Sequence, residues 1–306
     1  MHGRIFITGA TGFIGGSVAQ RLVAVGADVR GLARSRTRAT VLESLGVRPI
    51  MGHLSDATLL AQEARAADAV INAADADDRQ AVDILIETLA GTGKALIHTS
   101  GSSVVADEAG GEPRDAVYTD IPEHPVSGKA ARVAIDRRVL AASADNIRSI
   151  VVCPTMIYGM GRGPTTQSQQ IPALLRHARD TGTSHYVGRG LNRWSHVHID
   201  DVTELYHLAL QRAASGSFFY AENGEATMLE IARDIARHLD VSGPESLSVD
   251  AASRVWERAA VLYGFGSNSR VRADRARQDL GWSPRNSSIF HDLPREAALY
   301  RRPPKK

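Results

Sequence analysis

The sequence predicts an α/β protein, with a doubly wound parallel sheet and a smaller, mainly helical C-terminal lobe. Three observations predict this fold class. Short apolar runs alternate with helical patterns through the first half of the chain, a glycine-rich turn follows the first run, and the alternation stops near Gly159. Strands that alternate with helices form βαβ units, in which the helices cover both faces of a parallel sheet.

The first strand and the first helix enclose the most informative stretch of the chain. Residues Arg4–Ile7 form a short apolar run, as a buried parallel strand does. Apolar residues at helical spacing over Val18–Val25 predict the helix. The stretch Thr8–Gly15 therefore lies between a strand and a helix, and this context gives its glycine pattern meaning.

Three glycines of this stretch have separate roles in a dinucleotide-binding turn. Gly9 allows a tight bend, Gly12 lets the backbone approach a pyrophosphate, and Gly15 lets the helix pack closely on the strand. The free N–H groups and the positive dipole at the helix N-terminus then bind the phosphates. The sequence thus predicts a Rossmann domain that binds a dinucleotide cofactor.

The elements that follow continue the alternation. The expected strands are Asp28–Ala33, Ala69–Ala73, Ala95–Thr99 and Ser149–Cys153. The expected helices between them are Thr37–Leu45, Asp56–Ala66, Arg79–Leu89 and Ala130–Ala142. Beyond a glycine-rich loop at 159–164, the expected helices are Ile171–Arg179, Val202–Gln211 and Met228–His238.

The break in this rhythm predicts two domains. We expect a dinucleotide-binding Rossmann domain over residues 1–160 and a substrate-binding lobe over residues 161–306, with part of 195–225 returning to the Rossmann domain. The lobe is expected over the carboxyl edge of the sheet, where doubly wound folds bind their ligands.

The composition narrows the classes of partner. With 306 residues, of which 43% are hydrophobic, the chain can bury a large core, and its net charge of +2 creates no strong field for nucleic acid. No apolar run approaches transmembrane length, so we expect no membrane association and a cytoplasmic location. The single cysteine, Cys153, forms no internal disulfide and is interpreted as a small buried apolar side chain. The expected partner is a small-molecule substrate, and a homodimer is considered as the assembly.

The residue that closes the second strand distinguishes NAD from NADP. An acidic residue there would bind the ribose 2′-OH, whereas arginine suits a 2′-phosphate. Asp28 begins this strand and lies at the wrong end, while Arg34 and Ser35 follow its last residue and Arg38 comes shortly after. Arg34 can pair with the phosphate and Ser35 can donate a hydrogen bond. The sequence favours NADP(H) over NAD(H), and the alternative is a solvated basic loop that caps the next helix.

Further motifs occur along nearly the whole chain. They are Ala73-Ala74, Thr99-Ser100-Gly101, Pro154–Gly159, Gly190–Trp194, Val197–Val202 and Leu280–Pro284. With these and the glycine turn, the sequence resembles the extended and atypical short-chain dehydrogenase/reductases, and most closely members of the NAD(P)-dependent epimerase/dehydratase-like group. The resemblance implies hydride transfer by a nicotinamide cofactor.

The resemblance also implies which residues contact the cofactor and the substrate. The expected cofactor contacts are Gly9, Thr11, Gly12, Phe13, Ile14, Gly15, Arg34, Ser35, Arg38, Leu54, Ala73, Ala74, Thr99, Lys129, Pro154 and Thr155. The expected substrate contacts are Ser100, Arg193 and Trp194. The last two follow a glycine loop that faces the substrate cleft in this family, and would suit a flat or anionic substrate. The alternative is that Trp194 anchors the two lobes.

The catalytic pair of the family is missing. Its members use a Tyr-x-x-x-Lys pair on one helix, in which the ammonium lowers the pKa of the phenol, and a serine or threonine after the preceding strand. Here Pro125 stands four residues before Lys129, and Gly128 stands four residues before Arg132, the other candidate for the lysine position. The motif spacing places Gly101 at the serine position. Neither register supplies a phenol.

The candidate catalytic residues are therefore substitutes, namely Ser102, Lys129 and Tyr158. Lys129 can also be a solvated lysine, and Tyr158 can pack in a strand-to-loop corner. The leading hypothesis is an NADP(H)-dependent oxidoreductase that transfers hydride to or from a small carbonyl, enone or alcohol. The second is an NADP(H)-binding redox-sensing or regulatory protein without catalysis, and the third is a nucleotide-sugar epimerase/dehydratase, which ordinarily needs the missing tyrosine.

A group of histidines and aspartates resembles a metal site in composition only. His196, His198, Asp200 and Asp201 stand close together in the sequence. We expect no metal, because Asp200 or Asp201 can cap a helix that begins near Val202 and the histidines belong to the preceding strand.

Overall fold

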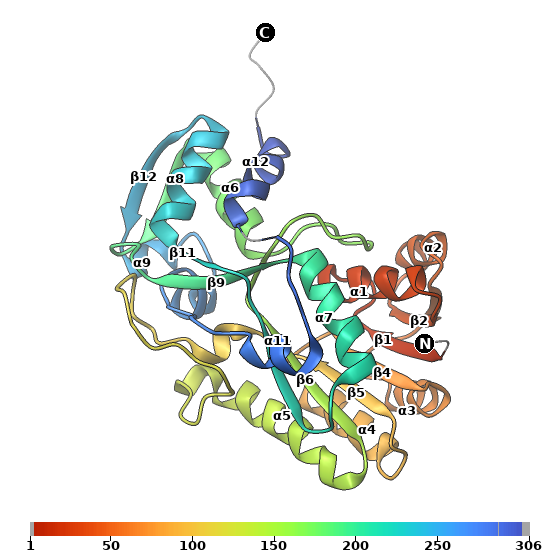
Figure 1. The fold of residues 1–306 in the computed structure, drawn as a ribbon. Helices are drawn as coiled ribbons and strands as arrows, with labels where there is room; N and C mark the ends of the chain where they lie inside the picture. Colours follow the sequence, from red (N-terminus) through yellow and green to blue (C-terminus); the bar gives the residue numbers. More distant parts are fainter. Residues whose placement is uncertain (1–2, 287, 302–306) are drawn as a thin grey trace.

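The centre of the molecule is a seven-stranded sheet in the strand order β10-β6-β5-β4-β1-β2-β3 (Figure 1). The computed structural model describes residues 3–286 and 288–301. The strands of this sheet are β1 (Arg4–Thr8), β2 (Asp28–Ala33), β3 (Arg48–Met51), β4 (Ala69–Asn72), β5 (Ala95–Thr99), β6 (Arg148–Pro154) and β10 (Ser217–Ala221). All neighbouring pairs are parallel, which confirms the doubly wound fold expected from the sequence.

Helices cover both faces of the sheet (Figure 1). One face carries α1 (Phe13–Ala24), α2 (Arg36–Ser44), α7 (Ile199–Arg212) and α11 (Asp274–Leu280), and the other carries α3 (Ala57–Ala66), α4 (Arg79–Leu89) and α5 (Ala130–Ala141). Each face of the sheet has its own hydrophobic core. In strand β1, Ile5 and Ile7 pack in the core under α1 and α7, and Phe6 packs in the core under α3 and α4. Alternate side chains of a strand point to opposite faces, so each face buries one apolar set.

Two strands of the sheet were not among the strands named from the sequence. The short strand β3 was not expected from the sequence, because its residues Arg48–Met51 are mixed in polarity and none is fully buried at this edge of the sheet. Strand β10 comes from residues beyond 160 and pairs with β6, so this later segment extends the sheet. Among the described residues, no helix combines the length and the apolar character that crossing a membrane requires.

The C-terminal lobe contains helices and short strands (Figure 1). Its helices are α6 (Gln170–Thr181), α8 (Met228–Leu239), α9 (Val249–Ala252), α10 (Arg258–Ala260), a π-helical turn (Val261–Phe265) and α12 (Ile289–Ala298). Strands β7 (Met156–Tyr158), β9 (Arg193–His198) and β11 (Glu225–Thr227) form one small sheet, and β8 (Thr183–Val187) pairs with β12 (Ser242–Leu247). Strands β7 and β11 have three residues each, which is too short to show a period in the sequence. A third core with Tyr158, Trp194 and Phe265 holds the lobe together.

The expected cap of the helix near Val202 is wrong. Helix α7 begins at Ile199, and its N-cap is His198, whose Nδ1 accepts a hydrogen bond from the backbone N–H of Asp200 at 3.1 Å. The carboxylate of Asp201 instead accepts bonds from the backbone N–H groups of Arg285 and Asn286, at 2.8 and 3.0 Å. Asp201 therefore fixes the segment that follows α11 instead of capping its own helix.

Candidate active site

The glycine turn between β1 and α1 fits a pyrophosphate. Gly9 has a φ of +71°, and a Cβ there would lie 2.3 Å from the carbonyl oxygen of Ala73. A Cβ at Gly15 would lie 2.4 Å from the carbonyl oxygen of Gly9. No side chain caps the N-terminus of α1. The turn therefore packs against the loop after β4 and leaves the first N–H groups of the helix available to an anion.

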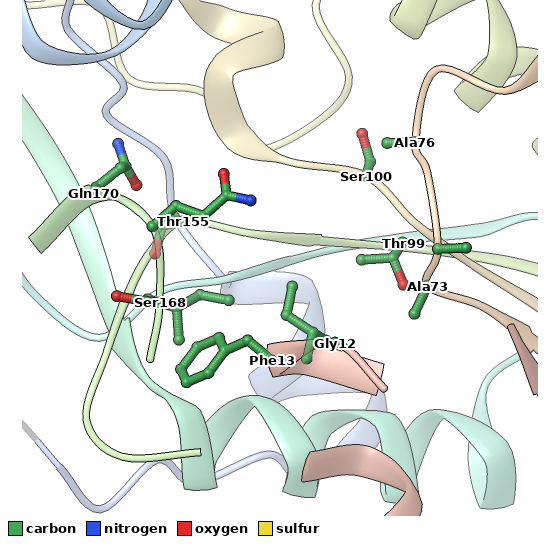
Figure 2. A pocket seen from close by; sticks show the side chains of 13 residues that line it. Gly12, Phe13, Ala73, Ala76, Thr99, Ser100, Thr155, Ser168 and Gln170 are labelled. Atoms are coloured by element: carbon green, nitrogen blue, oxygen red, sulfur yellow. The ribbon is translucent and has the colours of Figure 1, made fainter. Parts of the chain in front are cut away.

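A cleft runs along the carboxyl edge of the sheet and consists of three adjoining cavities. The central cavity has a volume of about 360 Å³ and lies over the glycine turn. Its lining includes Gly12 and Phe13 of this turn and helix, and Thr99 and Ser100 at the end of β5 (Figure 2). A second cavity, called here the Arg34 cavity after the arginine that lines it, shares Gly12, Ala73 and Ala74 with the central cavity and therefore adjoins it. A third cavity, called here the Tyr263 cavity, adjoins it at the other end through Thr155, Gln169 and Gln170.

The Arg34 cavity contains an arginine with a free guanidinium. Among the described residues, Arg34 has no hydrogen-bond or ion-pair partner, and its side chain is exposed. The nearby carboxylates are engaged, since Asp75 accepts a bond from the backbone N–H of Asp77 at 2.9 Å and Asp78 caps α4. A ligand phosphate in this cavity would meet an unpaired cation.

Two further residues of the basic stretch serve the fold. The Ser35 hydroxyl caps α2 by accepting a bond from the backbone N–H of Arg38 at 3.4 Å. The Arg38 guanidinium donates to the carbonyl oxygen of Pro164 at 2.8 Å and to the Thr165 hydroxyl at 3.4 Å. Arg38 thus ties α2 to the loop on the other side of the cleft.

A buried polar chain lies beneath the central cavity. The Thr8 hydroxyl donates to Asn72 at 2.6 Å, and the Asn72 amide lies 3.2 Å from Nδ1 of His98. The Ser100 hydroxyl donates to Asp136 at 2.6 Å, and the second oxygen of Asp136 lies 3.7 Å from Nε2 of His98. Burial lowers the pKa of His98 to about 4 and raises the pKa of Asp136 to about 7. The chain joins β1, β4, β5 and α5 at the floor of the cleft.

Gly101, at the family's serine position, lines the Tyr263 cavity, and Gly128, one of the two candidates for the family's tyrosine position, lies beside the Tyr263 hydroxyl. A Cβ at Gly101 would lie 3.6 Å from Nη1 of Arg132, and a Cβ at Gly128 would lie 2.0 Å from the hydroxyl oxygen of Tyr263. Arg132 is itself held by Asp77, to which its Nε donates at 2.7 Å and its Nη2 donates as well. Side chains from elsewhere in the chain therefore approach the two positions where the family's serine and tyrosine are absent.

Lys129 lies at the N-terminus of α5 and faces the same cavity. Its ammonium is 4.8 Å from the centroid of the Tyr263 ring. Burial lowers the pKa of Lys129, the positive charge of Arg132 lowers it further, and Asp77 opposes both. Tyr263 was not expected from the sequence, because it lies on a π-helical turn far from the other site residues and belongs to no motif.

The expected catalytic and substrate residues fall into two groups. Ser102 lines the Tyr263 cavity, and its hydroxyl accepts a bond from Ser269 at 2.8 Å. Tyr158 lines none of the three cavities and donates to the carbonyl oxygen of Asn286 at 3.0 Å. Trp194 lines the Tyr263 cavity and donates to the carbonyl oxygen of Ser267 at 2.7 Å. Arg193 lines none of the three and pairs with Glu225 at 3.1 Å.

The residues expected to contact the cofactor are spread along the whole cleft. Those that line the central or the Arg34 cavity are Gly9, Thr11, Gly12, Phe13, Ile14, Arg34, Leu54, Ala73, Ala74, Thr99 and Thr155. Ser100 lines the central cavity as well, whereas Lys129 and Pro154 line the Tyr263 cavity. The side chains of Ser35 and Arg38, and Gly15 behind the turn, line none of the three.

The histidines of β9 pack against an aromatic ring. The rings of His196 and His198 lie 5.6 and 5.3 Å from that of Tyr158, both edge-on. Within the described ranges, no group of three or more His, Cys, Asp or Glu side chains is placed to hold a metal ion.

Comparisons with known proteins agree on one family. The NAD dependent epimerase/dehydratase family matches residues 5–219. The chain is 30% identical to oxidase ucsJ of Acremonium sp over 96% of either protein. It is 26% identical, over 92% of either protein, to the 4-hydroxy-2-methyl-3-oxo-4-farnesyl-3,4-dihydroquinoline-1-oxide ketoreductase of Stigmatella aurantiaca. The structure of dTDP-glucose 4,6-dehydratase from Bacillus anthracis in complex with NAD is similar in fold, with a TM-score of 0.76, 18% identity, and coverage of 97% of this chain and 96% of that one.

Proposed function

The chain belongs to the NAD dependent epimerase/dehydratase family, and from this premise we propose that it is an NADP(H)-dependent oxidoreductase of the atypical short-chain type. It transfers hydride to or from a small organic carbonyl, enone or alcohol. The single observation that carries this proposal is the continuous cleft from Arg34, past the glycine turn, to the cavity that Lys129 lines.

The residues present fit a dinucleotide. The N-terminus of α1 would bind the pyrophosphate, and Gly9 and Gly15 allow the turn to lie close enough to do so. Thr99 and Thr155 would border the nicotinamide end in the central cavity. When bound, the nicotinamide supplies or accepts the hydride.

We propose NADP(H) over NAD(H) because of Arg34. Its guanidinium is unpaired among the described residues and lines the cavity next to the glycine turn. No acidic residue closes β2, which ends in Ala33. The Bacillus anthracis dehydratase binds NAD, so this preference would distinguish the present chain from that protein.

The lining of the Tyr263 cavity supports a flat carbonyl compound as the substrate. Trp194 and Phe265 offer aromatic surface, while Lys129 and Arg132 bring positive charge to the same cavity. These cations would stabilise the negative charge that develops on a carbonyl oxygen during reduction. The ketoreductase relative from Stigmatella aurantiaca acts, by its name, on a ketone. We propose that residues 1–160, with the segment that contains β10, bind the cofactor and that residues 161–306 cover the substrate.

The same cavity favours an enzyme over a sensor without turnover. A cavity of about 480 Å³ adjoins the central one, so side chains do not fill the space where a substrate would lie. The nucleotide-sugar epimerase hypothesis is weaker, since glycine stands at the positions where the family's serine and tyrosine would act on a sugar hydroxyl, at Gly101 and, in one register, at Gly128.

The direct test is to measure cofactor binding and turnover separately. Fluorescence titration with NADPH and NADH is expected to show tighter binding of NADPH, and a panel of ketones and enones is expected to oxidise it. Tighter binding of NADH would contradict the cofactor preference. Binding of NADPH without turnover of any carbonyl would instead favour the sensor.

A further inference from the structure

Tyr263 lies beside a glycine that stands at one of the two candidate positions for the family's catalytic tyrosine. Gly128 stands at the position where the resemblance expects the catalytic tyrosine of α5 when Arg132 is aligned with the family lysine. A Cβ at this glycine would meet the Oη, Cζ and Cε2 atoms of Tyr263, at 2.0, 2.4 and 2.9 Å. Tyr263 can therefore adopt this position only because residue 128 has no side chain.

The lysine next to this glycine holds the same ring. The Lys129 ammonium lies 4.8 Å from the centroid of Tyr263, over its face. A cation at this distance is attracted by the face of the ring. In the family the lysine and the tyrosine share one helix, whereas here the π-helical turn Val261–Phe265 of the C-terminal lobe brings a phenol to Lys129, the residue after Gly128. Single-turn π segments are frequent at functional sites.

A carboxylate faces the hydroxyl of Tyr263. The nearby Glu108 carboxylate raises the pKa of Tyr263, partial burial raises it as well, and the positive charge of Arg258 lowers it. The backbone of Glu108 has a φ of 53°, a left-handed conformation that a residue with a side chain seldom adopts. The side chain of Glu108 is exposed, so its carboxylate connects the phenol to solvent.

Tyr263 is also the phenol of the substrate cavity. Among the described residues that line this cavity, it is the only tyrosine. Three of the other polar groups there are committed or exposed: Ser102 is bonded to Ser269, Arg132 is bonded to Asp77, and Glu257 is exposed. Through Thr155, Gln169 and Gln170 the cavity adjoins the central one, where the cofactor is proposed to end.

We propose that Tyr263 is the proton donor of this enzyme, brought from the C-terminal lobe in place of the missing tyrosine of α5. The proposal rests on the proposed function. In reduction, the carbonyl carbon receives hydride from the reduced nicotinamide, and the carbonyl oxygen takes the phenolic proton of Tyr263. The phenolate beside Lys129 then regains a proton from water at the Glu108 carboxylate. One proton is taken from solvent for each alcohol formed, and the cofactor leaves oxidised.

The first test removes only the hydroxyl. A Tyr263→Phe variant is expected to keep its affinity for NADPH within about twofold and to lose about 100-fold in the rate of carbonyl reduction, since a positioned general acid contributes 10²–10⁴-fold. The matched control is Tyr186→Phe in β8, which lines none of the three cavities and is expected to keep the wild-type rate. A Tyr263→Phe rate within about threefold of wild type overturns the donor role.

The second test needs no cofactor and no activity. Gly128→Ala is expected to lower the melting temperature of the wild-type protein, because its Cβ clashes with Tyr263, and to lower it far less in a Tyr263→Ala background. Equal effects in both backgrounds would overturn the contact and, with it, the donor role. A wild-type protein that binds NADPH and reduces no carbonyl overturns the proposed function, whereas an active Tyr263→Phe variant overturns this inference alone.

Discussion

The Ser100 hydroxyl donates a 2.6 Å hydrogen bond to the carboxylate of Asp136, and both groups are buried at the floor of the cleft. Burial is the main reason that the pKa of Asp136 rises from 3.8 to about 7, and the bond from Ser100 opposes this rise. The native carboxyl therefore keeps its proton to near pH 7, whereas the unfolded chain loses it near pH 4. Since the native state binds more protons in this window, the stability contributed by this group falls as the pH rises through it.

Asp136→Asn removes this dependence. The free energy of unfolding of the variant, relative to that of the wild type, is expected to increase from about pH 4 to about pH 7, by up to about 4 kcal/mol. Urea denaturation at several pH values across the window measures it. His98 acts in the opposite direction, because burial lowers its pKa to about 4. It is present in both proteins, so the difference between them isolates Asp136. Parallel curves would contradict the raised pKa.

Arg34 is expected to set the preference for the 2′-phosphate. Arg34→Ala should weaken NADPH binding about 10- to 100-fold, the range of a charge-assisted hydrogen bond, and leave NADH binding within about threefold. The control is Arg36→Ala, two residues further on in α2, where the side chain lines none of the three cavities. Fluorescence titration with both cofactors gives the ratio. If Arg34→Ala binds NADPH as tightly as the wild type, the Arg34 guanidinium does not bind the 2′-phosphate.

Two glycines of the first turn should respond differently to alanine. Gly15→Ala is expected to lower the melting temperature by several degrees, because its Cβ would lie 2.4 Å from the carbonyl oxygen of Gly9. The nearest atom to a Cβ at Gly12 is 3.2 Å away, and this glycine lines two of the cavities. Gly12→Ala should therefore keep the melting temperature within about 2 °C and weaken cofactor binding at least tenfold. Equal melting temperatures for the two variants would contradict the close packing at Gly15.

The sequence predicts the end of the cleft that we propose for the cofactor better than the end that we propose for the substrate. Thr8–Gly15 is predictable because the strand, the turn and the helix are contiguous, and each glycine answers a local steric need. The contact between Gly128 and Tyr263 joins segments far apart in the chain, and the π-helical turn that carries Tyr263 has no periodic pattern. Only the absence of the family's tyrosine, at 125 or at 128, pointed to this place, and it could not identify which side chain lies there.

The cap of α7 shows a second limit of local prediction. Aspartate is a favoured N-cap, so Asp200 and Asp201 were natural choices from residue type alone. The structure uses His198 and leaves the Asp201 carboxylate to the backbone of Arg285 and Asn286. A side chain that residue type favours as the cap of its own helix can instead accept hydrogen bonds from a segment far away in the sequence.

Asn192 is expected to position Tyr263 without contacting it. Its side chain is fully buried, and its amide donates to the carbonyl oxygens of Phe265 and Ser267, at 3.0 and 2.7 Å. These two bonds fix the end of the π-helical turn that carries the phenol. Asn192→Ala removes both bonds. The Ser267 carbonyl keeps its bond from Trp194, whereas the Phe265 carbonyl loses its side-chain partner, and the change should cost about 1–3 kcal/mol of stability. It should also lower carbonyl reduction at least tenfold while NADPH binding stays within about twofold.

The matched control for this prediction is Asn223→Ala. The Asn223 amide also donates to a backbone carbonyl, that of Asn286 at 2.9 Å, but this bond lies away from the Tyr263 cavity. Asn223→Ala should lower the free energy of unfolding, measured in urea, and should keep the wild-type rate of carbonyl reduction per folded molecule. If Asn192→Ala and Asn223→Ala lose the same small fraction of that rate, the Asn192 amide serves stability alone. A larger loss of rate in Asn192→Ala, with intact NADPH affinity, would show that the hydrogen bonds from Asn192 to the end of the Val261–Phe265 turn position the Tyr263 phenol for proton transfer.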